Sequence, residues 1–309
     1  MAKANKKKES AYEKVTNQVI KLIEKGVAPW RKTWKSSRFE TPTSMASGKE
    51  YNGMNYLWLS VLKSDREYSS NIWGTWRAIK KNGGVIEWEA FKEARTTVCF
   101  WKIIEKEEID KNGIKRKKKI FFLNASDVVN LDCVTFPDGM PKKWETTDEE
   151  DDNVAPPLEV AEEVVKKYLE DNKGLQLKHG GDKAFYMPSR DTIQMPKREK
   201  FEGNSEYYST LFHEMGHSTG HKARLSREGV TGMNFFGSHE YSKEELVAEF
   251  TACFLCSHVG IEDTRENSAA YLKNWVSALK DEPRMLVQAS GLAKKATEYI
   301  LGNKEVASK

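Results

Sequence analysis

Two histidines and a glutamate in the second half of the chain have the spacing of a metal-binding helix. The segment FHEMGH contains His213, Glu214 and His217, which follow the pattern H-E-x-x-H. Residues four apart lie on one face of an α-helix, so both imidazoles can reach one metal ion. The pattern predicts a Zn²⁺ site with Glu214 as the general base of metal-assisted hydrolysis, and another divalent metal such as Mn²⁺ is the alternative.

A catalytic zinc ion needs a third protein ligand. The segment KEELVAEF offers two carboxylates four residues apart; we expect Glu245 to bind the metal and Glu249 to accept a hydrogen bond from a ligand imidazole. The reverse assignment is the alternative. His221 is another candidate ligand, although Gly220 is expected to end the helix and turn it away. A longer zinc-peptidase pattern, H-E-x-x-H-x-x-G-x-x-H, requires a histidine at its last position, where this chain has Ala223, so that class of peptidase is disfavoured.

A peptide bond is the expected substrate of this site. The stretch AFYMPSRDTIQMP ahead of the helix can offer backbone groups to an extended peptide by strand addition. His239 and Tyr241 are candidates to stabilise the oxyanion, because of their residue types and their nearness in sequence. Cys253 and Cys256 form a CxxC motif, but their apolar neighbours indicate small buried residues instead of a metal or redox site.

Composition excludes several classes of protein. The chain has 309 residues with 50 Lys+Arg, 46 Asp+Glu and a net charge of +4, as expected for a globular protein of one or two domains. Four cysteines are too few for a disulfide framework in a chain of this length. No apolar stretch is long enough for a membrane span or signal peptide. We therefore expect a cytoplasmic monomer with no membrane partner.

The distribution of charge and proline divides the chain. Basic runs lie in the first half, at Lys6–Lys8 and Lys115–Lys119, whereas an acidic run covers Asp148–Asp152. The region 136–157 combines this acidic run with prolines and has almost no apolar periodicity, which is typical of a linker. We predict an α+β fold with a first domain at 1–135 and a mostly helical domain with a small sheet at 158–309.

Periodicity predicts the elements that carry these residues. In the first domain, helices are expected at residues 11–25 and around NYLWLSVLKS, followed by a strand at TTVCFWKII and a hairpin with a basic tip around an Asn-Gly turn. In the second, a helix is expected at LEVAEEVVKKYLED, then two short strands joined by a Pro-Ser-Arg-Asp turn. Three further helices contain FHEMGH, KEELVAEF and SAAYLKNWVSALK.

Aromatic and basic residues are interleaved in the first domain. Seven of the nine tryptophans precede residue 102. Phosphates attract Lys and Arg, and unstacked bases need a flat aromatic face, so the pattern favours binding of single-stranded DNA. The alternative is that the rings are core, which we expect for Trp58. The candidate DNA-binding residues, placed in loop-like polar surroundings, are Trp30, Arg31, Lys32, Trp34, Trp73, Trp76 and Arg77.

Five motifs in order give the chain a resemblance to the ArdC-type antirestriction family of plasmids and phages. They are VTNQVIKLIEKGVAPWRKTW, PTSMASGKEYNGMNYLWL, AFYMPSRDTIQMP, HEMGHSTGHKARL and EELVAEF. The resemblance implies an N-terminal domain that binds single-stranded DNA and a C-terminal zincin-like metallopeptidase domain. The chain departs from the family pattern just before TTVCFWK, where the segment EWEAFKEAR stands in place of a Gly-containing basic turn.

The resemblance implies protection of incoming DNA against host restriction. Host restriction enzymes or other DNA-bound proteins are the expected protein partners. One alternative is a DNA-binding protein that acts by occupancy with a non-catalytic metal site, and another is a protease directed to DNA-bound proteins. The intact Glu214 favours chemistry, because a purely structural site needs only its ligands.

Overall fold

The computed structural model describes residues 9–24, 41–109, 115–144, 157–232, 239–261 and 269–303. Four predicted DNA-binding residues, Trp30, Arg31, Lys32 and Trp34, lie outside these ranges, as does most of the predicted acidic linker. Among the described residues, no helix is long and apolar enough to cross a membrane.

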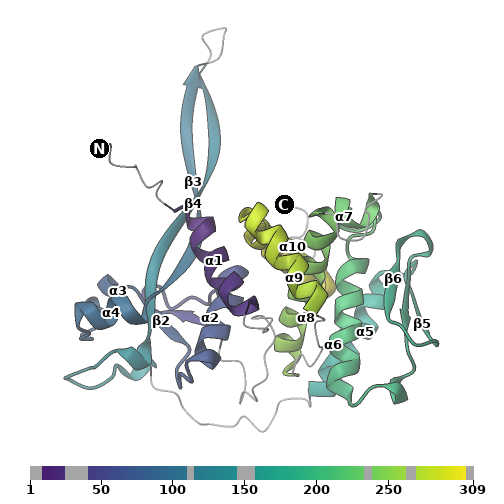
Figure 1. Cartoon of the computed structure of the whole chain (residues 1–309), viewed down its shortest axis with the longest axis horizontal. Helices are drawn as coiled ribbons and strands as arrows, with labels where there is room; N and C mark the ends of the chain where they lie inside the picture. Colours follow the sequence, from purple (N-terminus) through teal and green to yellow (C-terminus); the bar gives the residue numbers. More distant parts are fainter. Residues whose placement is uncertain are drawn as a thin grey trace.

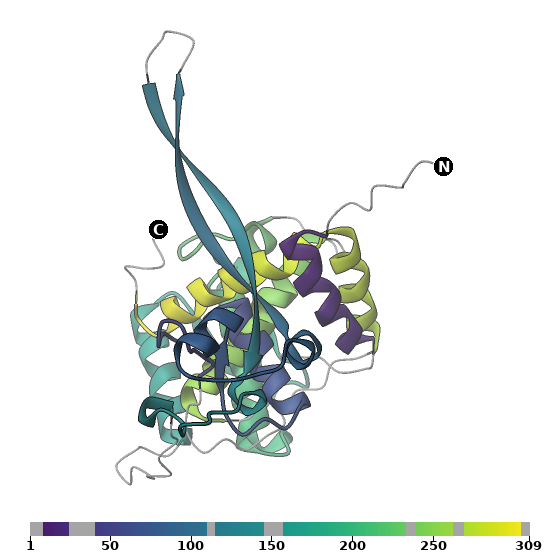
Figure 2. The same cartoon turned by 90° about the vertical axis from the view of Figure 1, so that its left-hand side faces the viewer.

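A four-stranded sheet in the first half has the strand order β1-β2-β4-β3. Its strands are β1 (Thr43–Ser44), β2 (Ile72–Gly74), β3 (Thr96–Ile109) and β4 (Lys115–Asn130). The antiparallel pair β3 and β4 runs in continuous register from Thr96 opposite Val128 to Ile109 opposite Lys115. Its outer part extends beyond the body of the molecule as a twisted two-stranded ribbon (Figures 1 and 2). The predicted antiparallel pairing is confirmed, whereas the Asn-Gly turn expected at its tip lies outside the described residues.

Short helices surround this sheet. They are α1 (Ala11–Ile23), α2 (Met54–Asp65), α3 (Trp76–Lys81) and α4 (Trp88–Ala94). Helix α1 begins at a capping box, in which the Ser10 side chain accepts from the Glu13 amide while the Glu13 carboxylate accepts from the Ser10 amide. The loop predicted around Trp73 and Trp76 is wrong: Trp73 lies in β2 and Trp76 begins α3.

The second half is mostly helical. Its helices are α5 (Pro157–Asp171), α6 (Asn204–Ser218), α7 (Glu228–Thr231), α8 (His239–Val259), α9 (Ala269–Asp281) and α10 (Arg284–Ile300). A three-stranded sheet has the order β5-β7-β6, with β5 (Gln176–His179), β6 (Phe185–Met187) and β7 (Thr192–Met195). The α+β class and the predicted helices are confirmed; α7, α10 and β5 were not predicted.

The largest hydrophobic core contains residues from both halves of the chain. Leu59 of α2 and Trp73 of β2 share this core with Leu246 and Phe250 of α8 and with Leu286 of α10. Helix α1 also packs against α9 and α10, and α2 packs against α10 (Figure 2). Separate cores lie under the three-stranded sheet and α6, and around α3 and α4. The two halves therefore stabilise each other through burial of shared apolar surface.

A substitution in the first half should destabilise helices of the second. We expect Leu59→Ala to lower the free energy of unfolding by about 2–5 kcal/mol and to speed amide hydrogen exchange in α10 as well as in α2. The control is Ile79→Ala, in the core around α3 and α4, which contains no residue of α8 or α10. Unchanged exchange in α10 of the Leu59→Ala variant would contradict a shared core.

Candidate metal centre

A close contact between α6 and α8 brings the predicted metal ligands together. Gly216 lies in α6 where a Cβ atom would stand 3.1 Å from the Ala248 Cα atom and 3.2 Å from the Thr251 Cβ atom of α8. Only glycine fits at this distance without displacement of the α8 backbone. The histidine face of α6 therefore lies directly against the glutamate face of α8.

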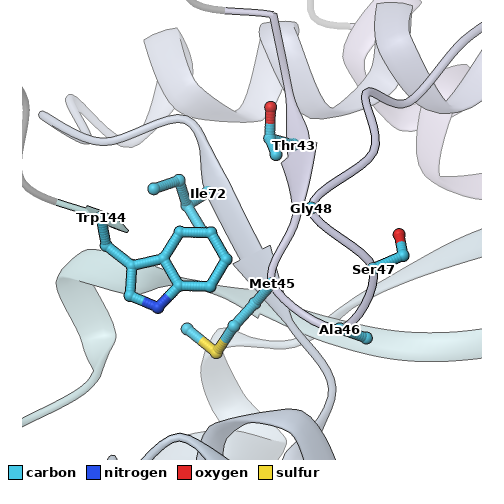
Figure 3. Close-up of a pocket in the computed structure, with 7 residues that line it drawn as sticks. All are labelled: Thr43, Met45, Ala46, Ser47, Gly48, Ile72 and Trp144. Carbon is cyan, nitrogen blue, oxygen red and sulfur yellow. The ribbon is translucent and has the colours of Figure 1, made fainter. Parts of the chain in front are cut away.

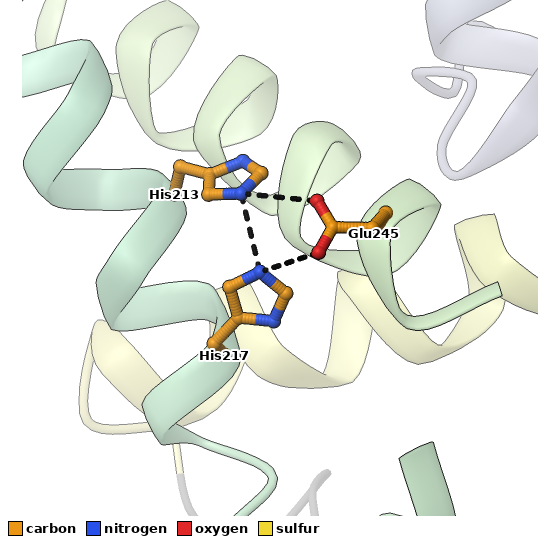
Figure 4. Close-up of side chains that lie close together, drawn as sticks. All are labelled: His213, His217 and Glu245. Atoms are coloured by element: carbon orange, nitrogen blue, oxygen red, sulfur yellow. Dashed lines mark hydrogen bonds and ion pairs between the residues drawn. The ribbon is translucent and has the colours of Figure 1, made fainter. Parts of the chain in front are cut away.

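His213, His217 and Glu245 form one compact group, in which the potential ligand atoms all lie within 4.8 Å of one another. The two Nε2 atoms are 3.2 Å apart. The Glu245 oxygens lie 3.6 Å from the Nε2 atom of His213 and 3.6 Å from that of His217 (Figure 4). Of the two glutamates considered for this position, the structure places Glu245 on the Nε2 side of both rings.

Two more carboxylates lie on the opposite side of the imidazole rings. A Glu249 oxygen is 3.6 Å from the Nδ1 atom of His213, and a Glu244 oxygen is 3.3 Å from the Nδ1 atom of His217. A carboxylate beside Nδ1 favours the tautomer with its proton there, which leaves the Nε2 lone pair free for a metal. Glu244 was missed because its only signal was the doublet Glu244-Glu245, which does not say which member faces α6.

Neighbouring charges in the site favour the ionised forms of His217, Glu244 and Glu245. Burial opposes protonation of His217, but Glu245, Glu244 and Glu214 outweigh it and raise the pKa of His217 to about 9. Burial likewise opposes ionisation of Glu245, yet His217 and His213 lower its pKa to about 2. Several buried carboxylates around two imidazoles create a negative potential that attracts a cation.

Other predicted site residues lie at different distances from this group. The Tyr241 hydroxyl donates a hydrogen bond to the Glu245 carboxylate, so Tyr241 lies at the site. His221 follows the end of α6, and its Nδ1 atom lies 3.9 Å from an Asp191 oxygen, outside the group of three. His239 is largely exposed and lies beside Glu282, so its nearness in sequence does not bring it to the group.

Predicted DNA-binding residues of the first half fall into two groups. Trp73 is fully buried, and its indole nitrogen donates to the Asn71 side chain, so the prediction that its ring is available to a base is wrong. Trp76 is only partly buried, and the next residue, Arg77, is exposed.

Trp76 belongs to an aromatic group on the surface of α3 and α4. Its ring meets that of Trp88 edge to face at 5.0 Å between centroids, and Trp88 stacks on Phe91 at 5.7 Å. Lys80 lies over the Trp76 ring and Lys92 over the Trp88 ring. Trp88 is 48% exposed. The segment EWEAFKEAR therefore contributes an exposed tryptophan that was not among the predicted DNA-binding residues.

A cavity of about 530 Å³ opens beside β1 in the first half (Figure 3). Met45, Ile72 and Trp144 form its apolar wall, and Ser47 and Gly48 form its rim. The wall residues also pack on the core beneath Trp76 and Phe91. The cavity therefore lies over the same core as the aromatic surface.

Comparisons with known proteins match both halves. A model of the zincin-like metallopeptidases matches residues 163–292. A model of the N-terminal domain of the anti-restriction factor ArdC matches residues 9–129. The first covers α6 and α8, and the second covers the four-stranded sheet with α1 to α4.

Similar solved structures extend this match over almost the whole chain. The metal-free structure of the antirestriction protein ArdC from plasmid R388 is 31% identical, with a TM-score of 0.70 over 94% of this chain and 97% of that one. The Mn(II)-bound structure of the same protein is 30% identical, with a TM-score of 0.69 over 95% and 98%.

Sequence relatives differ in length. Uncharacterized protein y4eC of Sinorhizobium fredii is 30% identical over 94% of this chain and 91% of its own length. The DNA primase TraC of Escherichia coli is 30% identical over 95% of this chain, which spans only 20% of the primase. With the metallopeptidase-like fold, the ArdC N-terminal fold and their order all matched, the chain belongs to the ArdC family of antirestriction proteins.

Proposed function

We propose that this antirestriction protein binds single-stranded DNA through its first half and hydrolyses peptide bonds at a zinc site formed by His213, His217 and Glu245. The observation that carries the proposal is the convergence of two Nε2 atoms and one carboxylate, with a further carboxylate beside each Nδ1 atom. Restriction enzymes and other DNA-bound proteins are the proposed protein substrates.

The donor set fits a divalent metal. Two imidazoles and one glutamate are a known ligand set of catalytic zinc, which leaves a position open for water. Imidazole nitrogen suits Zn²⁺ better than Mg²⁺ or Ca²⁺, while the carboxylate also suits Mn²⁺. The buried Nδ1 atom of His213 has no hydrogen-bond partner among the described residues, but it faces Glu249 at 3.6 Å. A small contraction around a cation would bring these groups into contact.

Glu214 is the proposed general base. A bound zinc ion supplies a Lewis acid that polarises a carbonyl and makes its water acidic near neutral pH. Glu214 lies in α6 between the two histidines, is 7% exposed, and contributes to the raised pKa of His217. It would take a proton from the attacking water and pass it to the leaving amine. Tyr241, held at Glu245, is the candidate to stabilise the oxyanion.

The aromatic surface of α3 and α4 is the proposed contact for DNA bases. Trp88 presents an exposed ring, and Trp76 lies beside it. Lys80 and Arg77 are exposed cations on α3 that can neutralise phosphates, whereas Lys92 of α4 is paired with Glu89 at 2.6 Å. Duplex DNA should bind more weakly, because its bases are already stacked on one another.

The first prediction concerns metal content. Purified wild-type protein should hold about one zinc ion per chain, whereas His213→Ala, His217→Ala and Glu245→Ala should lose it, because each removes one of three ligands. Glu249→Ala should weaken binding by about 10- to 100-fold. Elemental analysis and calorimetric titration measure both. The control is His239→Ala, which removes a histidine beside Glu282. Equal zinc content in all variants would refute the ligand assignment.

The second prediction concerns catalysis. Glu214→Gln should keep its zinc and lose about 10²- to 10⁴-fold in peptide hydrolysis, because only the base is removed. The assay uses candidate restriction proteins with and without single-stranded DNA. A variant that retains full antirestriction activity in cells would favour action by occupancy over proteolysis.

The third prediction concerns DNA. Trp88→Ala and Trp76→Ala should each weaken binding of a single-stranded oligonucleotide by about 1–3 kcal/mol, because each removes a stacking surface. Affinity should fall steeply with salt. Fluorescence anisotropy on the full chain measures both effects, since the two halves share a core. Phe185→Ala on β6, 40% exposed in the wild type, is the matched control. Unchanged affinity in both tryptophan variants would exclude this surface.

A further inference from the structure

The segment that follows α6 folds back and places a buried arginine behind the metal site. Arg227 and Glu244 are each only 6% exposed. The Arg227 Nε atom donates to one Glu244 oxygen at 2.9 Å, and Nη2 donates to the other at 2.6 Å. This is a two-pronged pairing of guanidinium and carboxylate, the geometry that fixes both oxygens of an acid.

The same Glu244 oxygen that accepts from Arg227 Nη2 lies 3.3 Å from the Nδ1 atom of His217. Arg227, Glu244 and His217 therefore form a continuous chain that ends at the ring whose Nε2 atom faces Glu245. A buried carboxylate without a partner would be strongly destabilised. The two Arg227 donors fix both oxygens of the Glu244 carboxylate, one of which is placed to accept a hydrogen bond from the His217 Nδ1–H group.

Two glycines give this arginine its position. A Cβ atom at Gly229 would stand 2.7 Å from the Glu244 Cβ atom, and one at Gly220 would stand 2.4 Å from a Val230 methyl carbon and 3.0 Å from Arg227 Nη2. Neither glycine has a positive φ angle, so the requirement is space. The segment between them fits closely against α8, and its helix α7 lies beside α8 (Figure 1).

We propose that Arg227 is a positioning residue of the metal site, which acts on His217 through Glu244. This inference rests on the proposed function, because it assumes that His217 binds the metal. Arg227 fixes the Glu244 carboxylate; Glu244 fixes the tautomer and the orientation of the His217 ring. The Nε2 atom is then directed at the metal position before the ion arrives, which raises affinity by lowering the cost of ordering the site.

A purely structural role is the competing explanation. Arg227 also donates to the Gly216 carbonyl at 2.8 Å and to the Thr219 hydroxyl at 2.6 Å, and these contacts close the end of α6. A structural role predicts lower stability with unchanged metal affinity, whereas positioning through Glu244 predicts weaker metal binding even where the fold is retained.

A double-mutant cycle on the full chain separates these explanations. The variants are Arg227→Lys, which keeps the charge and loses the fork, Glu244→Gln, which keeps the shape and loses the charge, and their combination. Zinc affinity is measured by competition with a chelator, and the melting temperature is measured without metal. The absorption spectrum of Co²⁺-loaded protein reports the geometry of the site. Thr219→Val is the matched control, because it removes an Arg227 contact without changing Glu244.

Each single variant should weaken zinc binding by about 10- to 100-fold and alter the Co²⁺ spectrum. The double variant should bind zinc about as weakly as the single variant with the lower zinc affinity, because both substitutions interrupt the same series of contacts from Arg227 through Glu244 to His217. Thr219→Val should lower the melting temperature and leave affinity and spectrum unchanged. Gly229→Ala keeps every hydrogen-bond donor but crowds Glu244, so it should also weaken zinc binding. This variant tests the same contact if Arg227→Lys or Glu244→Gln does not fold.

Wild-type affinity in Arg227→Lys and Gly229→Ala, or losses that add fully in the double variant, would overturn the positioning role while the zinc site stands. Absence of zinc from the wild-type protein, or equal binding by wild type and His213→Ala, would instead refute the proposed metal site and this inference with it. The two failures are therefore distinguishable by the behaviour of the wild-type chain.

Discussion

The contact between α6 and α8 is the constraint on which the functional site depends. Gly216 of α6 lies against the Ala248 backbone, where a Cβ atom would stand 3.1 Å from the Ala248 Cα atom. Because the helices approach so closely, the imidazoles of one and the carboxylates of the other meet without long side chains reaching across a gap. A residue with a Cβ atom at position 216 would require α8 to shift by a few tenths of an ångström and would move the carboxylates of α8 away from the imidazoles of α6.

Helix α8 links this site to the rest of the molecule. Glu245 and Glu249 face the histidines of α6, whereas Leu246 and Phe250, each next to one of them, enter the core shared with α1, α2 and the four-stranded sheet. The orientation of α8, and hence of its carboxylates, is therefore held partly by residues of the first half of the chain. The two proposed activities are carried by different surfaces of a single packed body.

Buried charge is balanced locally in this design. The Glu244 carboxylate is paired with Arg227, and Glu245 interacts with two imidazoles and the Tyr241 hydroxyl. A second buried network, in which Asp191 pairs with Arg224 and Tyr186, holds the segment that follows α6 from the other side. Pairing lowers the free-energy cost of burying these polar groups. A negative electrostatic potential remains where the Nε2 atoms of the two histidines converge.

Sequence spacing alone determined the helix that carries His213 and His217, the α+β class and most helices, because helical periodicity and the H-E-x-x-H pattern are local properties. Spacing also limited the candidates for the third metal ligand to Glu245, Glu249 and His221. Only the tertiary structure decided which carboxylate faces which imidazole nitrogen, because the direction of each side chain from α8 depends on how that helix is rotated against α6. The same holds for Trp73 and Trp88: both are tryptophans of the first half, yet Trp73 is buried in a strand and Trp88 is 48% exposed. Long-range packing decided their environments, and a linear pattern carries no information on what covers a side chain.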